Sequence, residues 1–261
     1  MKNLFLRLSF YGEKFYGTQK QPHDETIQGL FEKLLSQIYT KPVKVVIASR
    51  LDRGVHALDF ALCFQTPDDS ISIEHLFYYL KRSVPKDIYL KDLRQVRDDF
   101  SPRYDCRNKQ YLYLIQNSAS INPLLSPFTF IPKHPLDENS LSSVLDIING
   151  EHDFRYFSTP EEDDNTIINI EDAYMVKNGD ILAIRFVSKS FLRYQVRFMV
   201  GAMIYHAYGK LSLDEIKIAL DGKKPTHFKY KAEPQGLILE KINYPEVEDK
   251  DVVTFPFLDR E

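Results

Sequence analysis

The order of hydrophobic periods in the first part of the chain limits the fold most strongly. Alternate residues from Leu4 to Phe10 are apolar, which predicts a strand with one buried face. Thr26 precedes a stretch with helical spacing that runs to about Tyr39, so it is the expected cap of a helix. Further elements are expected as strands at Val43–Ile47, Phe60–Phe64 and Ile88–Leu93 and as a helix at Ile73–Ser83. This β-α-β-β-α-β order is typical of a ferredoxin-like α/β sandwich.

A second group of elements begins near residue 105. Strands are expected at Lys109–Gln116, Ala173–Lys177, Ile181–Val187 and Gly236–Ile242, and helices at Leu141–Ile148, Phe191–Tyr208 and Leu213–Leu220. Asn178-Gly179 between two of these strands predicts a hairpin. Because this order echoes the first half, we expect an α+β protein in which two ferredoxin-like α/β lobes share a mixed or antiparallel central sheet, with a cleft between them. The expected domains are residues 1–104, residues 105–245 and an acidic C-terminal tail, residues 246–261.

Composition narrows the class of protein. The chain has 261 residues, of which 43% are hydrophobic, enough for two α/β cores. Its two cysteines, Cys63 and Cys106, make neither a disulfide framework nor a metal-binding pair. No apolar run is long enough to span a bilayer, and the N-terminus leads into a strand pattern instead of a signal sequence. The sequence therefore favours a cytoplasmic protein that does not associate with membranes.

Charge is distributed unevenly along the chain. The formal net charge is -3, which argues against a general binder of nucleic acid. Residues 189–231, however, contain nine Lys and Arg against three Asp and Glu. A basic stretch within an acidic protein is typical of an RNA-binding face, and equally of a solvated helix surface.

The segment Ser49–Ala57 places one carboxylate, Asp52, between two arginines. Asp52 follows an expected strand and precedes Gly54, so we expect it on a loop that presents its side chain to a cleft. Arg50 and Arg53 favour the ionised carboxylate and attract a polyanion. Such a group can act as a nucleophile or base on a nucleic acid, although a solvated ion pair has the same pattern.

This segment resembles a signature of the tRNA pseudouridine synthase A family, which reads roughly Gly-Arg-Thr-Asp-Ala-Gly-Val-His. Further blocks resemble the family in the same order between about residues 3 and 245. These blocks are Tyr11–Gln21, Thr26–Gln28, Phe100–Tyr104 with Lys109, Tyr111 and Tyr113, Gly150–Phe154, Phe191–Arg197 with Gly201, and Gly236-Leu237 with Tyr244-Pro245. Several positions depart from the family pattern, among them Thr18, which replaces a Trp, Leu51 a Thr, Arg53 a small residue and Gln195 a Met.

The resemblance implies a reaction and a partner. The family breaks the N1–C1′ bond of a uridine, turns the base and rejoins it through C5. Since no redox change occurs, no cofactor or metal is expected. By resemblance, the substrate is the anticodon stem-loop of tRNA, near positions 38 to 40, and the enzyme is a homodimer.

The resemblance also implies roles for individual residues. Asp52 matches the catalytic carboxylate, acting as nucleophile or as base on the sugar. Arg50 matches the residue that takes the place of the flipped base, and Tyr111 matches the tyrosine that packs on the uracil. Arg197 is expected to pair with the catalytic carboxylate, and Leu237 to seal the uracil pocket. Further RNA contacts are expected from Arg53, Arg103, Lys109 and Arg193. Arg193 and Arg197 would share one face of the expected helix, since they are four residues apart.

Other interpretations remain open from the residues alone. Changes such as Leu51 and Arg53 are compatible with an RNA-binding paralogue of weakened activity, or with a synthase for a different RNA. A glycoside hydrolase would need a second carboxylate such as Asp153, and the absence of Trp counts against a sugar platform. His56 and His152 are expected to satisfy local hydrogen bonds rather than to act in catalysis.

Overall fold

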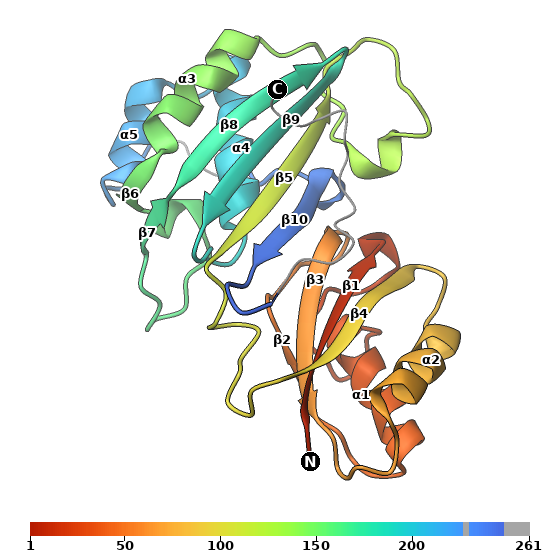
Figure 1. The fold of residues 1–261 in the computed structure, drawn as a ribbon. Helices are drawn as coiled ribbons and strands as arrows, with labels where there is room; N and C mark the ends of the chain where they lie inside the picture. The colour runs from red at the N-terminus through yellow and green to blue at the C-terminus, as the bar shows by residue number, and fades with distance from the viewer. Residues whose placement is uncertain (227–229, 248–261) are drawn as a thin grey trace. The chain divides into compact units, whose positions relative to one another are not determined.

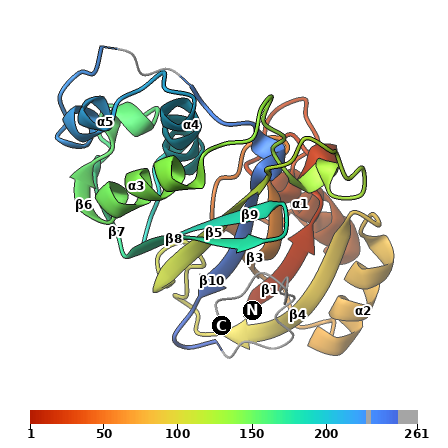
Figure 2. The same cartoon turned by 90° about the horizontal axis from the view of Figure 1, so that it is seen from above.

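The computed structural model describes residues 1–226 and 230–247, which form two compact units (Figures 1 and 2). The first unit comprises Met1–Arg107 and the described residues from Leu239 onward, and the second comprises Asn108–Ile238. Of the expected acidic tail, residues 248–261 lie outside the described residues. Within the described part of the chain, no helix has the length and apolar character needed to cross a membrane.

The first unit follows the β-α-β-β-α-β order predicted for it. Its elements are β1 (Asn3–Phe10), a short 3-10 turn η1 (Gly12–Lys14), α1 (Ile27–Tyr39), β2 (Val45–Ile47), β3 (His56–Gln65), α2 (Ile73–Ser83) and β4 (Ile88–Val96). The strand order is β4-β1-β3, with β2 also paired to β3, and all of these pairings are antiparallel. The expected cap is confirmed, because the Thr26 hydroxyl accepts a hydrogen bond from the Gly29 N–H.

Strand β10 (Leu237–Asn243) follows β3 in the strand order, and a buried ion pair holds its part from Leu239 onward in the first unit. The Arg7 Nε of β1 donates to the Asp59 Oδ1 of β3 at 3.0 Å, and both side chains are buried. Asp59 Oδ2 also accepts from the Ile242 N–H at 3.0 Å, and Arg7 Nη2 donates to the Ile242 carbonyl at 3.1 Å. Because both charges are hydrogen-bonded as well as paired, their burial is compensated.

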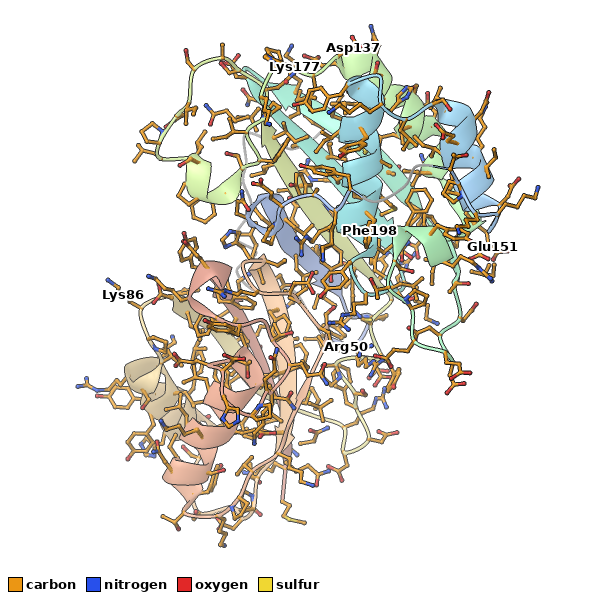
Figure 3. The ribbon with its side chains drawn as sticks, turned by 180° about the vertical axis from the view of Figure 1, so that it is seen from behind. Arg50, Lys86, Asp137, Glu151, Lys177 and Phe198 are labelled. Carbon is orange, nitrogen blue, oxygen red and sulfur yellow. The ribbon has the colours of Figure 1, made fainter. Side chains whose placement is uncertain are left out.

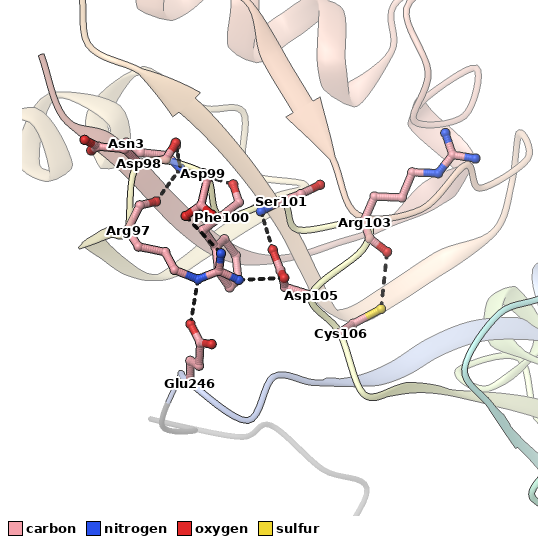
Figure 4. Close-up of polar contacts among 10 residues, drawn as sticks. All are labelled: Asn3, Arg97, Asp98, Asp99, Phe100, Ser101, Arg103, Asp105, Cys106 and Glu246. Carbon is pink, nitrogen blue, oxygen red and sulfur yellow. Dashed lines mark hydrogen bonds and ion pairs between the residues drawn. The ribbon is translucent and has the colours of Figure 1, made fainter.

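A second cluster of charges holds the segment that follows β4 (Figure 4). Arg97 forms ion pairs with Asp99 at 2.9 Å, Asp105 at 2.6 Å and Glu246 at 2.9 Å. Hydrogen bonds to Glu246, Asp99 and Asp105 raise the pKa of the Arg97 guanidinium. The Asn3 side chain donates to the Arg97 carbonyl at 2.9 Å, so the start of β1 is tied to the same place.

The second unit contains more elements than the first. They are β5 (Asn108–Gln116), η2 (Ser126–Phe128), α3 (Glu138–Ile148), β6 (Gly150–Asp153), η3 (Arg155–Phe157), β7 (Ile167–Ile170), β8 (Asp172–Asn178), β9 (Ile181–Ser188), α4 (Gln195–Ala207), α5 (Leu213–Leu220) and η4 (Pro234–Gly236). Strands β5, β9 and β8 pair antiparallel in that order, while β6 and β7 form a separate two-stranded sheet. Helix α3 packs against α4, α5 and β8.

The expected fold class is confirmed as a mixture of α and β elements with mostly antiparallel strands. The hairpin is also confirmed, since Asn178 pairs with Ile181 and Gly179 has a φ of 57°. Two predicted helix starts were wrong: α3 begins at Glu138 rather than at Leu141, and α4 begins at Gln195 rather than at Phe191. For α3, the Asp137 side chain caps the helix and accepts from the Ser140 N–H. For α4 the cause is Tyr194, whose φ of 66° is left-handed and stops the helix from extending toward the N-terminus.

Candidate functional site

Asp52 lies on the loop between β2 and β3, as expected. Its side chain is half-buried, whereas those of Arg50 and Arg53 on its two sides are exposed (Figure 3 labels Arg50). The chain turns directly after the carboxylate: the Val55 N–H donates to the Asp52 carbonyl at 3.2 Å, and Gly54 has a φ of 81°. Asp52 and Arg50 both take part in further interactions of their side chains or backbone.

Thr18 holds the residues that lead into Asp52. Its side chain is fully buried, and its hydroxyl donates to the Ser49 carbonyl at 2.9 Å while accepting from the Leu51 N–H at 2.8 Å. The Thr18 N–H also donates to the Leu51 carbonyl at 3.1 Å. Three hydrogen bonds therefore fix the backbone on the N-terminal side of Asp52. This role was not predicted from the sequence, where Thr18 stood out only as a departure from the family pattern.

Two glycines allow the segment after β1 to approach the Asp52 loop closely. A Cβ on Gly17, whose φ is +86°, would lie 2.5 Å from the Leu51 carbonyl oxygen. A Cβ on Gly12 would lie 1.9 Å from the Val55 carbonyl oxygen, and the Gly12 N–H donates to His56 Nδ1 at 3.0 Å. His56 is buried, so the expectation that it satisfies a local hydrogen bond is confirmed.

Arg53, which replaces a small residue of the family pattern, contacts an aromatic ring. Its guanidinium carbon lies 4.1 Å from the centroid of the Tyr16 ring, within the range of a cation–π interaction. Tyr16 is itself exposed, with 41% of its surface accessible. The pair therefore presents a cation and an aromatic ring to solvent, one residue from Asp52.

The second unit carries the predicted uracil contacts. Tyr111 on β5 is buried and meets the ring of Phe191 edge-on, with 5.0 Å between the ring centroids. Two residues along, the Tyr113 hydroxyl donates to the Glu233 carbonyl at 2.9 Å. Burial and the nearby Tyr230 and Glu233 raise the pKa of Tyr113 well above its usual value.

Leu237 is buried at the start of β10, directly after η4. The glycine before it is required for close packing, since a Cβ on Gly236 would lie 2.7 Å from the Tyr113 ring. Lys109, also on β5, is buried opposite Ser188, whereas we expected an RNA contact there. Leu237 and Lys109 are therefore both held in place by packing near β5.

Arg197 lies in the first turn of α4 and is 8% exposed. Its Nε donates to the Ala232 carbonyl at 2.8 Å, and its own carbonyl accepts from the Ala232 N–H at 2.9 Å. Arg193 lies in the turn before the helix, so the argument that both arginines share one helix face was wrong. Their guanidinium groups are nevertheless brought together, because both lie near the ring of Tyr194.

Three other sequence candidates have local partners. Arg103 is exposed, with its guanidinium 5.3 Å from the Tyr104 ring centroid. Asp153, the carboxylate considered for a hydrolase, pairs with Arg155 instead. Its Oδ2 accepts from Arg155 Nε at 2.7 Å, and its Oδ1 accepts from the Arg155 N–H at 3.0 Å. His152 Nε2 lies 3.1 Å from the Asn149 carbonyl oxygen, in agreement with a structural role.

Comparison with known proteins identifies the family. Residues 8–105 and 146–245 match a family model described as tRNA pseudouridine synthase. A tRNA pseudouridine synthase A from Aquifex aeolicus is 40% identical over 242 residues, which cover 93% of this chain and 99% of the relative. Proteins of the same name from Dictyoglomus thermophilum and Caldicellulosiruptor bescii are 36% and 31% identical, covering 94% of this chain and 100% of each relative. The chain therefore belongs to the tRNA pseudouridine synthase family.

Proposed function

We propose that this protein is an isomerase that converts uridine to pseudouridine in the anticodon stem-loop of tRNA, near positions 38 to 40. The observation that carries the proposal is the match to relatives named tRNA pseudouridine synthase A over almost their whole length. In the reaction the N1–C1′ bond breaks, the C5–C1′ bond forms and the C5 proton moves to N1 through solvent, so the base is isomerised without loss of atoms.

Asp52 is the proposed catalytic group, acting on the sugar either as a nucleophile or as a base. Its loop supports this role, because hydrogen bonds from Thr18 hold the backbone before the carboxylate, and the chain turns at Gly54 directly after it. A fixed carboxylate is better placed for reaction than one on a mobile loop. The two neighbouring arginines are exposed and provide positive charge for the approach of RNA.

For the remaining residues we propose the roles implied by family membership. Arg50 takes the place vacated by the flipped uridine, Tyr111 packs on the uracil and Leu237 excludes water from it. Arg197 compensates the charge of the catalytic carboxylate. Contacts to the RNA backbone are proposed for Arg53, Arg103, Lys109 and Arg193, with the smallest contribution from Lys109 because it is buried.

We further propose that two copies of the chain act together on one tRNA in the cytoplasm. A dimer presents two copies of the basic stretch of residues 189–231 to one tRNA, which favours binding of a polyanion by a chain whose net charge is -3. Light scattering after size-exclusion chromatography measures this directly. A mass of one chain, 30.5 kDa, for the free protein, together with a single chain in each complex with tRNA, would rule out the dimer.

The decisive measurement is tritium release from tRNA labelled at uridine C5, because rejoining the base through C5 displaces that hydrogen. We expect release by the wild type and none by Asp52→Asn, which keeps the shape of the side chain and removes its charge. Binding of tRNA by the variant, measured in parallel, shows that the loss is chemical. Release by Asp52→Asn at the wild-type rate would refute the role of Asp52.

The same experiment separates the alternatives. If the wild type binds tRNA without releasing tritium, an RNA-binding paralogue of weakened activity, or a synthase for a different RNA, is the better account. The departures at Leu51 and Arg53 make that comparison necessary. Repeating the assay with total cellular RNA then distinguishes a different substrate from a loss of activity.

A further inference from the structure

Tyr194 has an unusual backbone conformation directly before helix α4. Its φ of 66° and ψ of 2° are left-handed, and besides Thr40 no other non-glycine residue of the described chain has a positive φ. Such a conformation costs a non-glycine residue about 1–2 kcal/mol. Backbone strain of this kind is concentrated at functional sites, so the surroundings of this residue are informative.

Three cationic side chains surround the ring of Tyr194. The distances to the ring centroid are 3.6 Å from Lys231 Nζ, 4.9 Å from Arg193 Cζ and 5.7 Å from Arg197 Cζ. Arg193 Nη2 also donates to the Tyr194 hydroxyl at 3.2 Å. Each cation is attracted to the ring, and three like charges near one ring also repel one another.

The charges of two of these side chains are not neutralised locally. Within residues 1–226 and 230–247, neither Arg193 nor Lys231 forms an ion pair with a carboxylate. Arg193 is exposed and Lys231 is half-buried, so both can be reached from solvent. Arg197 differs, because it is buried and its Nε is used by the Ala232 carbonyl.

The helix adds to the positive potential at this place. Tyr194 is the N-cap of α4, a helix of 13 residues, and its side chain makes no capping hydrogen bond. The N-terminal end of a helix therefore contributes positive partial charge beside the cations. Gln195 is fully buried, and its Nε2 has no hydrogen-bond partner among the described residues. The start of α4 therefore has a buried hydrogen-bond donor that no described residue accepts. The first turn also carries Phe198, labelled in Figure 3, whose ring centroid is 6.0 Å from Lys231 Nζ.

We propose that Arg193 and Lys231, held around Tyr194, form a subsite for one phosphate of the RNA backbone. This rests on the proposed function, since it assigns a contact within the same substrate. A phosphodiester fits because a guanidinium binds two of its oxygens and an ammonium group adds a point charge. A nucleobase does not fit equally well, because Lys231 occupies a face of the Tyr194 ring. Tyr194 is a positioning residue that fixes the two cations.

The test is the salt dependence of tRNA binding, measured by fluorescence anisotropy for Arg193→Gln, Lys231→Gln and the double variant. The slope of log K against log salt becomes shallower by about 0.7–0.9 for each phosphate that the protein no longer neutralises. Because both cations bind the same phosphate, the slope for the double variant should change by about 0.7–0.9 in total. The charge-matched control is Lys133→Gln with Lys177→Gln, two exposed lysines of the same unit, and should keep the wild-type slope.

Two results would overturn the subsite. A double variant with the wild-type slope would show that no phosphate is bound there, and a change twice as large would show that the two cations bind separate phosphates. Tyr194→Gly provides an independent check, because glycine accepts the left-handed backbone without strain while the ring is removed. We expect its tRNA affinity to fall several-fold, and unchanged affinity would overturn the positioning role. If the wild type itself neither binds tRNA nor releases tritium, the proposed function has failed instead.

Discussion

At the scale of single residues, Thr18 has the clearest consequence for activity. Replacing it with Val keeps the shape of the side chain and removes the hydroxyl, which leaves the Ser49 carbonyl and the Leu51 N–H without that partner. Leaving buried polar groups unsatisfied costs about 1–3 kcal/mol. Since these groups precede Asp52, we expect kcat for tritium release to fall at least tenfold, with little change in KM for tRNA.

Thr18→Ser is the matched control for this prediction. It retains the hydroxyl and loses only a methyl group, so both hydrogen bonds can form and most of the activity should return. Chemical denaturation of all three proteins gives the accompanying change in stability. If Thr18→Val has the wild-type kcat, the hydrogen bonds to residues 49–51 do not position the carboxylate.

The sequence predicted the place of Asp52 better than the residues that hold it. A strand, a charged turn and Gly54 are local signals, and they correctly indicated a loop. The contacts of Thr18 join positions more than thirty residues apart, as its bond to Leu51 spans 33 residues, and no period in the sequence reports such a contact. The same reason explains why Lys231 was recognised only as part of a basic stretch and not as a neighbour of Tyr194.

At the scale of elements, helix α4 depends on a glycine. A Cβ on Gly201 would lie 2.1 Å from the Tyr230 carbonyl oxygen, so the segment that carries Lys231 packs directly on the helix. Gly201→Ala would ordinarily favour a helix by about 1 kcal/mol. Here we expect a net loss of about 1–3 kcal/mol in stability, because the backbone of Tyr230 must move. Weaker tRNA binding should accompany it.

Gly29→Ala on α1 is the comparison for this change. The nearest atom to its new Cβ is the Thr26 hydroxyl oxygen at 3.0 Å, a side-chain atom and not backbone. We expect its stability to stay within about 1 kcal/mol of the wild type, because helix propensity offsets the tighter contact. Equal losses from the two substitutions would show that the approach of Tyr230 is unimportant. Thermal unfolding followed by circular dichroism measures both.

Helices and strands with a clear hydrophobic period were predicted from the sequence, and strands too short to show such a period were missed. Helices α2 and α5 have the predicted bounds, because each combines an amphipathic pattern with a serine cap. Strands β6 and β7 have four residues each, too few to establish an alternation. The first residue of α4 could not be predicted because Tyr194 adopts a conformation that its residue type does not favour.

At the scale of the whole molecule, the chain returns to its first unit through β10, beside a core that contains a buried thiol. Cys63 on β3 is 3% exposed, and burial together with the charge of Asp105 raises the pKa of its thiol to about 12, from an ordinary value of 9.0. The folded protein therefore holds this proton more tightly than the unfolded chain does. Stability is constant below the unfolded pKa and decreases as the pH rises from about 9 toward 12.

The decrease in stability with rising pH can be measured. Between pH 8 and pH 10, the wild type should lose about 1.4 kcal/mol more unfolding free energy than Cys63→Ala, because only the unfolded state of the wild type releases the thiol proton in that range. Urea denaturation under reducing conditions at several pH values measures the difference. The cavity left by alanine lowers stability at every pH, so the two proteins are compared by the slope of unfolding free energy against pH. Burial is the main cause that raises the pKa of Tyr244 well above its usual value, and it acts in both proteins, so Tyr244 contributes almost equally to the two slopes. Parallel slopes for the two proteins would mean that the thiol reaches solvent in the folded state, and that the core around β3 opens more readily than its packing indicates.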